Sequence, residues 1–230
     1  MNRLILASVF AAVFALSLAA AMPLGAALAF TRAGAMGLSA AAVSGSIWNG
    51  RLDDMRLKGI RFGAVAARLD PVSLLAATRR LRLDSREGHA VLALGRAQGV
   101  EGADAVIDIA LLGLPVAGVV RLQDATVLFE RGRCSVAKGR LIADIAQGAW
   151  KGPALQGELG CDGAIAVARL SGGNAGGEAE VTLSVDAAAR YRLQTRVTGG
   201  DAGLRLALTI AGFTESESGM LRSDQGRLGT

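Results

Sequence analysis

Aromatic residues, histidine, cysteine and proline are all scarce in this chain of 230 residues. Aromatics make up 4% of the sequence, and there are one histidine, two cysteines and four prolines. The lone histidine, His89, has no serine or cysteine placed beside it as a nucleophile, and the cysteines form no Cys-x-x-Cys pair for zinc. Phosphate-binding glycine motifs and the nucleophile elbow are missing too. We therefore expect no catalytic, cofactor-binding or metal-binding residue and predict that the protein is not an enzyme.

The charged residues are dispersed along the chain. Lys and Arg number 25 against 20 Asp and Glu, giving a net charge of +5. No basic helix with interleaved aromatics accompanies this excess, so we expect no nucleic-acid partner. The densest basic cluster, RRLR at 79–82, fits a solvated strand edge. Asp53 and Asp54 are adjacent, so on a strand their carboxylates point to opposite faces and do not share a site.

A long uncharged run opens the chain. Residues Leu4–Phe30 are 27 residues without a charge, whereas about 20 apolar residues span a bilayer as a helix. A cleaved signal peptide has an apolar core of only about 7–15 residues, although Ala-Leu-Ala at 27–29 offers a cleavage site before Phe30. The length favours an uncleaved transmembrane anchor over residues 1–31, with the following domain exported.

Alternation of apolar and polar residues dominates the chain beyond the anchor. It is clearest at 180–186, 190–197 and 204–210, where it predicts three consecutive antiparallel strands; Leu204, Leu206, Leu208 and Ile210 share one face of the last. Further strands are expected at about 52–58, 60–69, 79–86, 89–95, 104–111, 117–130, 133–145, 154–160 and 163–170. The pattern predicts an all-β fold, mainly an antiparallel meander, forming a curved sheet, a half-barrel or a sandwich.

Three segments interrupt or end this pattern. A short helix is expected near 71–78, with Asp70 as its N-cap and Pro71 as its first residue. The sequence SGGNAGGE at 171–178 predicts a flexible loop, and residues 214–230 predict a disordered tail. The β-rich domain would then cover residues 32–213. Its interior would be aliphatic, and the pattern leaves open whether a second sheet fills it or an acyl chain binds there.

Cys134 and Cys161 are the only cysteines. An even number in an exported domain predicts a disulfide between them, with two reduced buried cysteines as the alternative.

The stretch VSGSIWNGRL at 43–52 places Trp48 between Gly45 and Gly50. In an extended segment Ser46, Trp48 and Gly50 share one face, and a buried tryptophan there removes about 150–250 Å² from water. We predict that Trp48 plugs the core at one end of the sheet; an exposed partner-binding residue is the alternative.

Several of these segments resemble the type II secretion system protein N family. The resemblance covers Gly45–Gly50 after the anchor, the Leu-x-Pro-x-x-Leu-Leu segment of Leu69, Pro71, Leu74 and Leu75, and the two cysteine-bearing segments at 133–141 and 155–167. It implies a single-pass protein of the bacterial inner membrane with its C-terminal domain in the periplasm. Its function would be accessory, with the β domain bridging or scaffolding other secretion-system components. The alternative is an envelope protein that binds or transfers lipid in an aliphatic β-groove.

Overall fold

The computed structural model describes residues 7–10, 13–14, 17, 21–30, 38–57, 60–70, 80–108, 118–145, 154–174 and 177–228. The helix expected near 71–78, including Pro71, lies outside the described residues. Among the helices within these ranges, none has the length and apolar character needed to cross a membrane.

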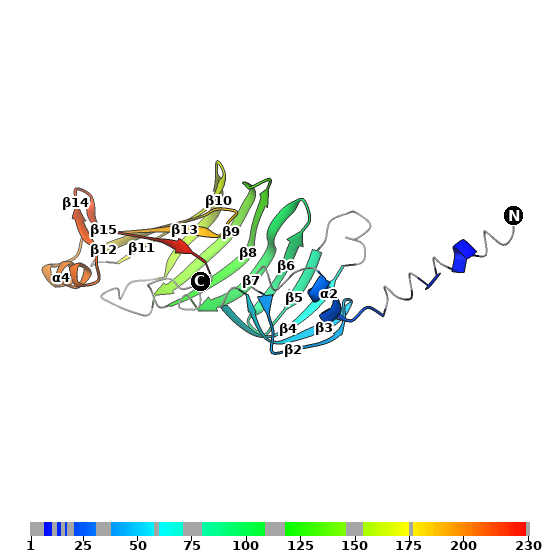
Figure 1. The fold of residues 1–230 in the computed structure, drawn as a ribbon. Coiled ribbons are helices and arrows are strands. Elements are labelled where there is room, and N and C mark those ends of the chain that lie inside the picture. The colour runs from blue at the N-terminus through cyan, green and yellow to red at the C-terminus, as the bar shows by residue number, and fades with distance from the viewer. Residues whose placement is uncertain are drawn as a thin grey trace.

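Within the described residues, one open antiparallel sheet of 15 strands makes up most of the molecule (Figure 1). The neighbours along the sheet follow the order of the chain, except that β15 lies between β13 and β14 and that β1 and β2 both pair with β3. The strands are β1 (Leu38–Ser39), β2 (Ala42–Ser46), β3 (Asn49–Leu57), β4 (Ile60–Leu69), β5 (Arg80–Asp84), β6 (Gly88–Leu94), β7 (Ala97–Asp108), β8 (Gly118–Glu130), β9 (Arg133–Ile145), β10 (Leu155–Asp162), β11 (Ile165–Asn174), β12 (Gly177–Val185), β13 (Arg190–Thr198), β14 (Thr214–Ser216) and β15 (Gly219–Arg227). The predicted antiparallel meander is confirmed, and it forms a single open sheet instead of a sandwich.

Bulges bend the long strands of this sheet. Asp54, Gly102 and Asp124 have φ values of 48°, 54° and 47°, and each lies where the register of β3, β7 or β8 shifts against its neighbour. Aspartate and glycine tolerate this left-handed conformation better than other residues do. Because a bulge bends its strand and increases the local twist, these positions curve the sheet.

The hairpin between β8 and β9 is as tight as a hairpin can be. Glu130 pairs with Arg133, so only Arg131 and Gly132 form the loop, with φ values of 50° and 77°. Two positive φ angles in a two-residue loop are the signature of a turn whose twist matches that of the strands. This turn keeps the two longest strands in register over most of their length.

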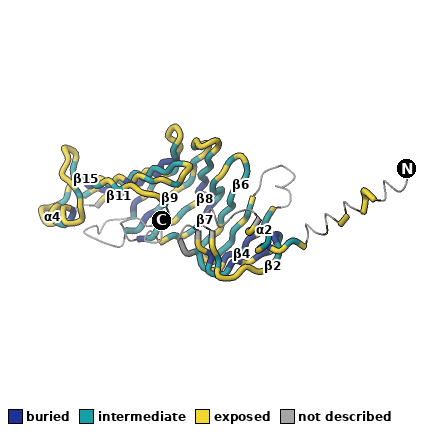
Figure 2. The backbone as a smooth tube through the Cα atoms, viewed as in Figure 1, coloured by how far each residue is buried: buried dark blue, intermediate teal, exposed yellow. Residues whose placement is uncertain are grey.

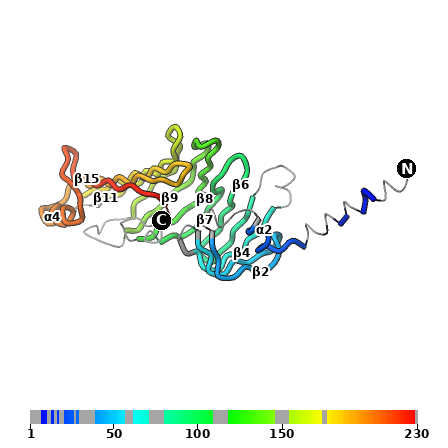
Figure 3. The backbone as a smooth tube through the Cα atoms, viewed as in Figure 1, coloured from blue at the N-terminus to red at the C-terminus, as the bar shows by residue number. Residues whose placement is uncertain are grey.

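Two short helices pack on the sheet near its two ends. Helix α2 (Leu24–Phe30) lies against β2 and β3, and α4 (Ala202–Ile210) lies at the opposite end, next to β14 and β15 (Figure 3). Figure 2 colours the backbone by burial, and the buried residues form two hydrophobic clusters. The N-terminal cluster contains Leu24, Ile47, Leu52, Met55, Val65 and Ala67. The C-terminal cluster contains Leu141, Ala143, Leu155, Ala168, Leu170, Ala179, Val197, Leu208 and Met220.

The strand predicted at 204–210 is wrong, because this segment is the helix α4. Alternate leucines are also compatible with a helix, in which Leu204 and Leu208 share one side, four residues apart. The Asp201 carboxylate caps the helix by accepting a hydrogen bond from the Leu204 N–H at 2.8 Å, as an N-cap does. Leu208 is buried, whereas Leu206 and Ile210 are 64% and 81% exposed.

The disordered tail predicted for residues 214–230 is also wrong for the part that the structure describes. Residues Gly219–Arg227 form β15, which pairs with β13 from Met220 to Arg227. The segment has few apolar residues to bury, and it is held by backbone hydrogen bonds to an edge that would otherwise be open. The flexible loop predicted at 171–178 is likewise mostly strand, because β11 and β12 pair as far as Asn174 and Gly177.

Candidate functional site

The strands from β4 to β13 turn one almost purely aliphatic side to the interior of the curve. Cross-strand partners follow one another in register, for example Leu69, Leu81, Leu92, Val100 and Val127 across β4 to β8. A second row runs through Leu122, Leu141, Gly157, Leu170 and Val181 across β8 to β12. We call this side of the sheet the aliphatic face. It comprises the residues of these two rows and those of β4 to β13 that point to the same side.

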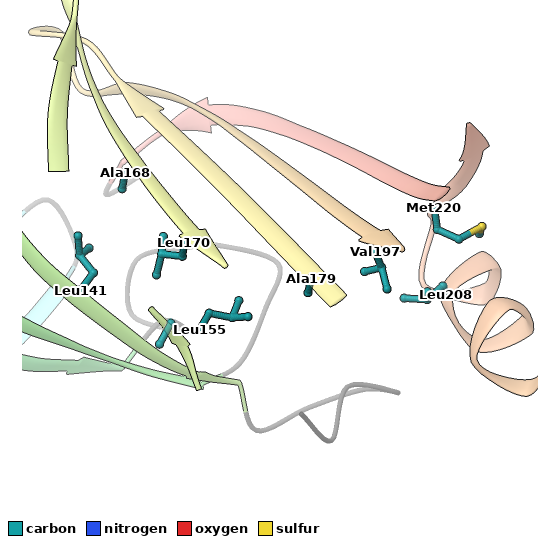
Figure 4. Packing of buried hydrophobic residues seen from close by; sticks show 9 residues of the cluster. Leu141, Leu155, Ala168, Leu170, Ala179, Val197, Leu208 and Met220 are labelled. Carbon is teal, nitrogen blue, oxygen red and sulfur yellow. The ribbon is translucent and has the colours of Figure 1, made fainter. Parts of the chain in front are cut away.

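The aliphatic face is free of charge over ten consecutive strands. The strand register from β4 to β13 places no Asp, Glu, Lys or Arg side chain of the described strands on this face. Its C-terminal end is covered: Figure 4 shows Leu155, Leu170, Ala179 and Val197 along the strands, with Leu208 of α4 near Met220. The middle is less covered, since Leu81, Leu92 and Val127 are only partly buried and Leu94 is 39% exposed.

A charged pair marks the C-terminal limit of the aliphatic face. Arg222 and Asp224 on β15 are in register with Thr195 and Leu193, so they point to the same side as the aliphatic residues. Their side chains form an ion pair with a 2.9 Å contact. The Arg222 guanidinium also donates to the Ala211 carbonyl at 2.6 Å, which holds the end of α4.

The opposite side of the sheet, the polar face, carries surface ion pairs. Arg80 contacts Glu101 at 3.0 Å, and Arg121 contacts Asp144 at 3.0 Å. Exposed pairs of this kind contribute about 0–1 kcal/mol each. They keep this face soluble and do not by themselves define a site.

Two titrating groups on exposed parts of the chain are perturbed. The hydrogen bond and charge of Asp53 raise the pKa of Arg51 above its ordinary value. At the turn after β12, burial acts to raise the pKa of Asp186, but hydrogen bonds from the Arg190 backbone and side chain and from the Ala188 N–H outweigh it. The pKa of Asp186 is therefore lower than usual. Both shifts belong to local turns and strand pairs instead of a catalytic constellation.

A shallow depression of about 430 Å³ lies on the polar face of β5 to β7. Arg82, Asp84, His89 and Glu101 line it, and His89 Nε2 lies 3.3 Å from Asp104. The described residues contain no group of three or more His, Cys, Asp or Glu that could hold a metal ion. The depression combines opposite charges in an open, solvated position, and no Ser, Thr or Cys lines it.

The segment Gly45–Gly50 forms a hairpin instead of an extended strand. Ser46 pairs with Asn49, so Ile47 and Trp48 are the two-residue loop between β2 and β3. Ile47 is buried, and Trp48 packs partly buried on the N-terminal cluster. The prediction that Ser46, Trp48 and Gly50 share a strand face is wrong, because the chain reverses between them.

This hairpin joins three parts of the chain. The Ile47 N–H donates to the Met22 carbonyl at 3.1 Å, and the Ile47 carbonyl accepts from the Leu69 N–H at 2.9 Å. Gly50 lies directly under Leu24 of α2, and a Cβ atom at this position would collide with the Leu24 side chain. Gly50 therefore lets α2 approach the hairpin closely, and Gly45 lets β2 and β3 approach each other, because a Cβ atom there would collide with the Asn49 carbonyl oxygen.

Cys134 and Cys161 form the predicted disulfide, with their Cα atoms 5.6 Å apart. Cys134 pairs with Phe129 and Cys161 with Ala166 in the sheet. The bond thus links the start of β9 to the end of β10, near the tips of two adjacent hairpins. It lies away from the Gly45–Gly50 hairpin and stabilises the middle of the sheet.

A sequence model for protein N of the type II secretion system matches residues 36–223. The chain belongs to this family. No curated protein matches the chain, and no solved structure does.

The protein N family match covers the described sheet from Leu38 as far as Ser223, within β15. The resemblance stated from the sequence is confirmed. The family identifies the protein as a component of a type II secretion system that interacts with other components of that system. In this chain, Gly45, Trp48 and Gly50 come together at one hairpin, while Pro71 lies outside the described residues. Sequence reasoning missed the strand β15, because its alternation of Met220, Arg222 and Asp224 mixes apolar and charged residues on one face.

Proposed function

We propose that this protein is an accessory inner-membrane component of a type II secretion system, anchored by its N-terminal segment and bridging other components with its β domain in the periplasm. The family supports the secretion role. The observation that carries the bridging role is the sheet order, since strand neighbours follow the chain from the N-terminal to the C-terminal edge. At about 4.8 Å per strand, the twelve spacings from β2 to β15 separate the two edges by roughly 58 Å along the sheet, far enough to contact two partners at once.

Exposed apolar residues near the N-terminus support the anchor. Val9, Phe10, Val13 and Phe14 are all more than half exposed, and the rings of Phe10 and Phe14 stack at 6.3 Å. Exposed apolar surface of this kind is typical of segments that enter a membrane. We take Pro23 as the end of the anchor, because the chain is already part of the β domain from Leu24 onward.

Retention of the anchor is supported by α2. Leu24 is only 3% exposed and belongs to the N-terminal cluster. Cleavage before Phe30 would remove Leu24 and leave the space above Gly50 empty. We expect the intact mass of membrane-extracted protein to include residues 1–29, and a mature protein beginning at Phe30 would contradict the anchor.

Photo-crosslinking from the two edges tests the bridging role. A photoreactive amino acid is placed at Ser44 on β2, at Gln225 on β15 and, as a control, at Arg140 in the middle of the polar face. All three side chains are exposed. In cells with the complete secretion apparatus, we expect Ser44 and Gln225 to crosslink to different secretion components and Arg140 to give neither product. Crosslinks from only one edge, or the same products from all three positions, would contradict bridging.

The second candidate function is lipid binding, which the charge-free and partly uncovered aliphatic face favours. Leu92 lies at its middle, whereas the adjacent Val91 faces the polar side, in register with Arg82 and Glu101. Native mass spectrometry of a detergent-free domain that retains α2 measures bound phospholipid. If lipid occupies the face, Leu92→Glu should remove it and Val91→Glu should not. A lipid-free mass for the unmodified domain would reject this function.

A further inference from the structure

The last strand of the sheet has a neighbour along only a third of its outer side. β14 pairs with Gly219, Met220 and Leu221 and then ends. On its other side β15 is paired with β13 as far as Arg227. In the part of the chain that the structure describes, no strand lies outside residues 222–227.

The outward-facing backbone groups of this edge follow from the pairing with β13. The Leu228 N–H donates to the Ala189 carbonyl at 2.8 Å. Hydrogen-bonded pairs recur at every second residue of an antiparallel ladder, so residues 222, 224 and 226 direct their N–H and C=O groups to β13. Ser223 and Gln225 therefore direct theirs outward, and both residues are exposed.

The N-terminal edge of the sheet is built differently. Pro23 forms a bridge with Ser46 of β2, and the Met22 carbonyl accepts from the Ile47 N–H. Proline has no N–H to offer an added strand. The preceding chain thus occupies one end of the β2 edge, whereas the β15 edge offers its backbone along residues 222–227.

The surroundings of the β15 edge are basic on the polar face. Arg192 is in register with Gln225, and Arg190 is in register with Arg227. Arg190 is paired with Asp186 at 2.7 Å, while Arg192 has no ion-pair partner among the described residues. On the other face, the Arg222–Asp224 pair places charge where an apolar strand would need to pack. Inward charges of this kind discourage unspecific edge-to-edge aggregation.

We propose that the β15 edge binds an extended acidic peptide segment of a partner protein, which adds to the sheet as a further strand. Strand addition obtains affinity from backbone hydrogen bonds and specificity from alternate side chains. Here Ser223 and Gln225 supply the backbone groups, and acidic side chains of the segment meet the positive charge of Arg192. The identity of the partner rests on the proposed secretion function, but the binding chemistry of the edge does not.

Fluorescence anisotropy with the full chain in detergent micelles tests this binding. The probe is a labelled peptide of alternating valine and glutamate, and the control peptide has lysine in place of each glutamate. We expect binding of the acidic peptide only. Arg192→Glu should weaken it by about tenfold, as expected for charges that steer and fix register. Equal binding of both peptides, or none of the acidic one, would overturn the proposal.

Gln225→Pro isolates the backbone contribution, with Gln225→Val as its matched control. Proline removes the outward N–H and leaves the hydrogen bonds to β13 in place, as edge strands tolerate. The proline variant should lose about tenfold or more in affinity, one well-made hydrogen bond being worth about that much, and the valine variant should bind normally. Equal affinity of the two variants would overturn the proposal.

Hydrogen exchange on the unmodified chain keeps the inference testable if the proline variant does not fold. The acidic peptide should slow exchange at the Ser223 and Gln225 amides, and unchanged exchange there would overturn the proposal. The chain could instead self-associate in a concentration-dependent way that Gln225→Pro abolishes. That result would show that a second copy occupies the edge, and it would also overturn the proposal. Peptide binding without crosslinks from Gln225 in cells would contradict only the bridging function, and crosslinks without peptide binding would contradict only this inference.

Discussion

Gly45→Ala should destabilise the protein considerably more than Gly132→Ala, although the two glycines have nearly the same backbone conformation. Their φ values are 80° and 77°. The two positions differ in the space around a new methyl group. At Gly45 a Cβ atom would collide with the Asn49 carbonyl oxygen, whereas at Gly132 it meets nothing within 4 Å.

The expected magnitudes follow from these two contributions. A left-handed alanine costs about 1–2 kcal/mol, and the loss of glycine flexibility in the unfolded chain returns about 0.4–1 kcal/mol. Gly132→Ala should therefore lower the free energy of unfolding by roughly 1 kcal/mol. Gly45→Ala adds an overpacking term of about 1–3 kcal/mol, because the nearest atoms are backbone and cannot rotate away. We expect a total of about 2–4 kcal/mol.

Urea unfolding followed by tryptophan fluorescence measures both variants, since Trp48 lies in the same hairpin as Gly45. For a chain of this size the extra 1–3 kcal/mol corresponds to a Tm lower by several degrees, at about 2–4 °C per kcal/mol. If the two variants unfold within about 0.5 kcal/mol of each other, the close approach of β2 and β3 at Gly45 is not a determinant of stability. That result would refute the packing described for the Gly45–Gly50 hairpin.

Three further predictions concern the disulfide, the core and one carboxylate. Removing the bond with Cys134→Ala and Cys161→Ala should cost about 3.5 kcal/mol for a separation of 27 residues in the chain-entropy model; a change below about 1 kcal/mol in urea unfolding would contradict this. Leu52→Ala should cost about 3–5 kcal/mol because Leu52 is 1% exposed, whereas Leu94→Ala, at 39% exposure, should cost about 1 kcal/mol or less; similar costs would contradict the lesser coverage of the middle of the aliphatic face. The lowered pKa of Asp186 means that its carboxylate stabilises the fold above the unfolded-state pKa of about 3.9, and that this stabilisation disappears as the pH falls through the lower folded-state value. Asp186→Asn should therefore make the free energy of unfolding less dependent on pH below about pH 4, and an unchanged acid profile would contradict the assignment.

Sequence and structure agree best in the long alternating segments. The strands β4, β8 and β9 begin and end within one residue of their predicted bounds at 60–69, 117–130 and 133–145. Apart from bulges such as that at Asp124, their side chains alternate between water and the interior, and this period of two over such lengths indicates strands. The disulfide was predictable for a different reason, because two cysteines allow only one intramolecular pair.

The errors share a cause in tertiary context. The alternation at 204–210 suits both a strand and a helix that buries Leu204 and Leu208, and β15 occupies the edge of β13 that a strand there would have used. Residues 219–227 carry too little apolar surface to predict a strand, yet β13 supplies hydrogen-bond partners for their backbone. In the segment Gly45–Gly50, the local sequence did not indicate that the chain reverses at Ile47 and Trp48. The reversal depends on the packing of α2 against Gly50, which is a contact outside the segment.

The sequence by itself determined the strand periodicity, the faces on which charges lie and the pairing of the cysteines, because these depend on local alternation and on counting. The tertiary structure decided that the sheet stays open, that α2 and α4 cover its two ends, and that the last strand leaves an edge without a neighbour. These features depend on contacts between residues far apart in the chain, such as Leu24 with Gly50 and Thr195 with Arg222. A local pattern specifies which side chains face together, and only the assembled fold specifies what covers them.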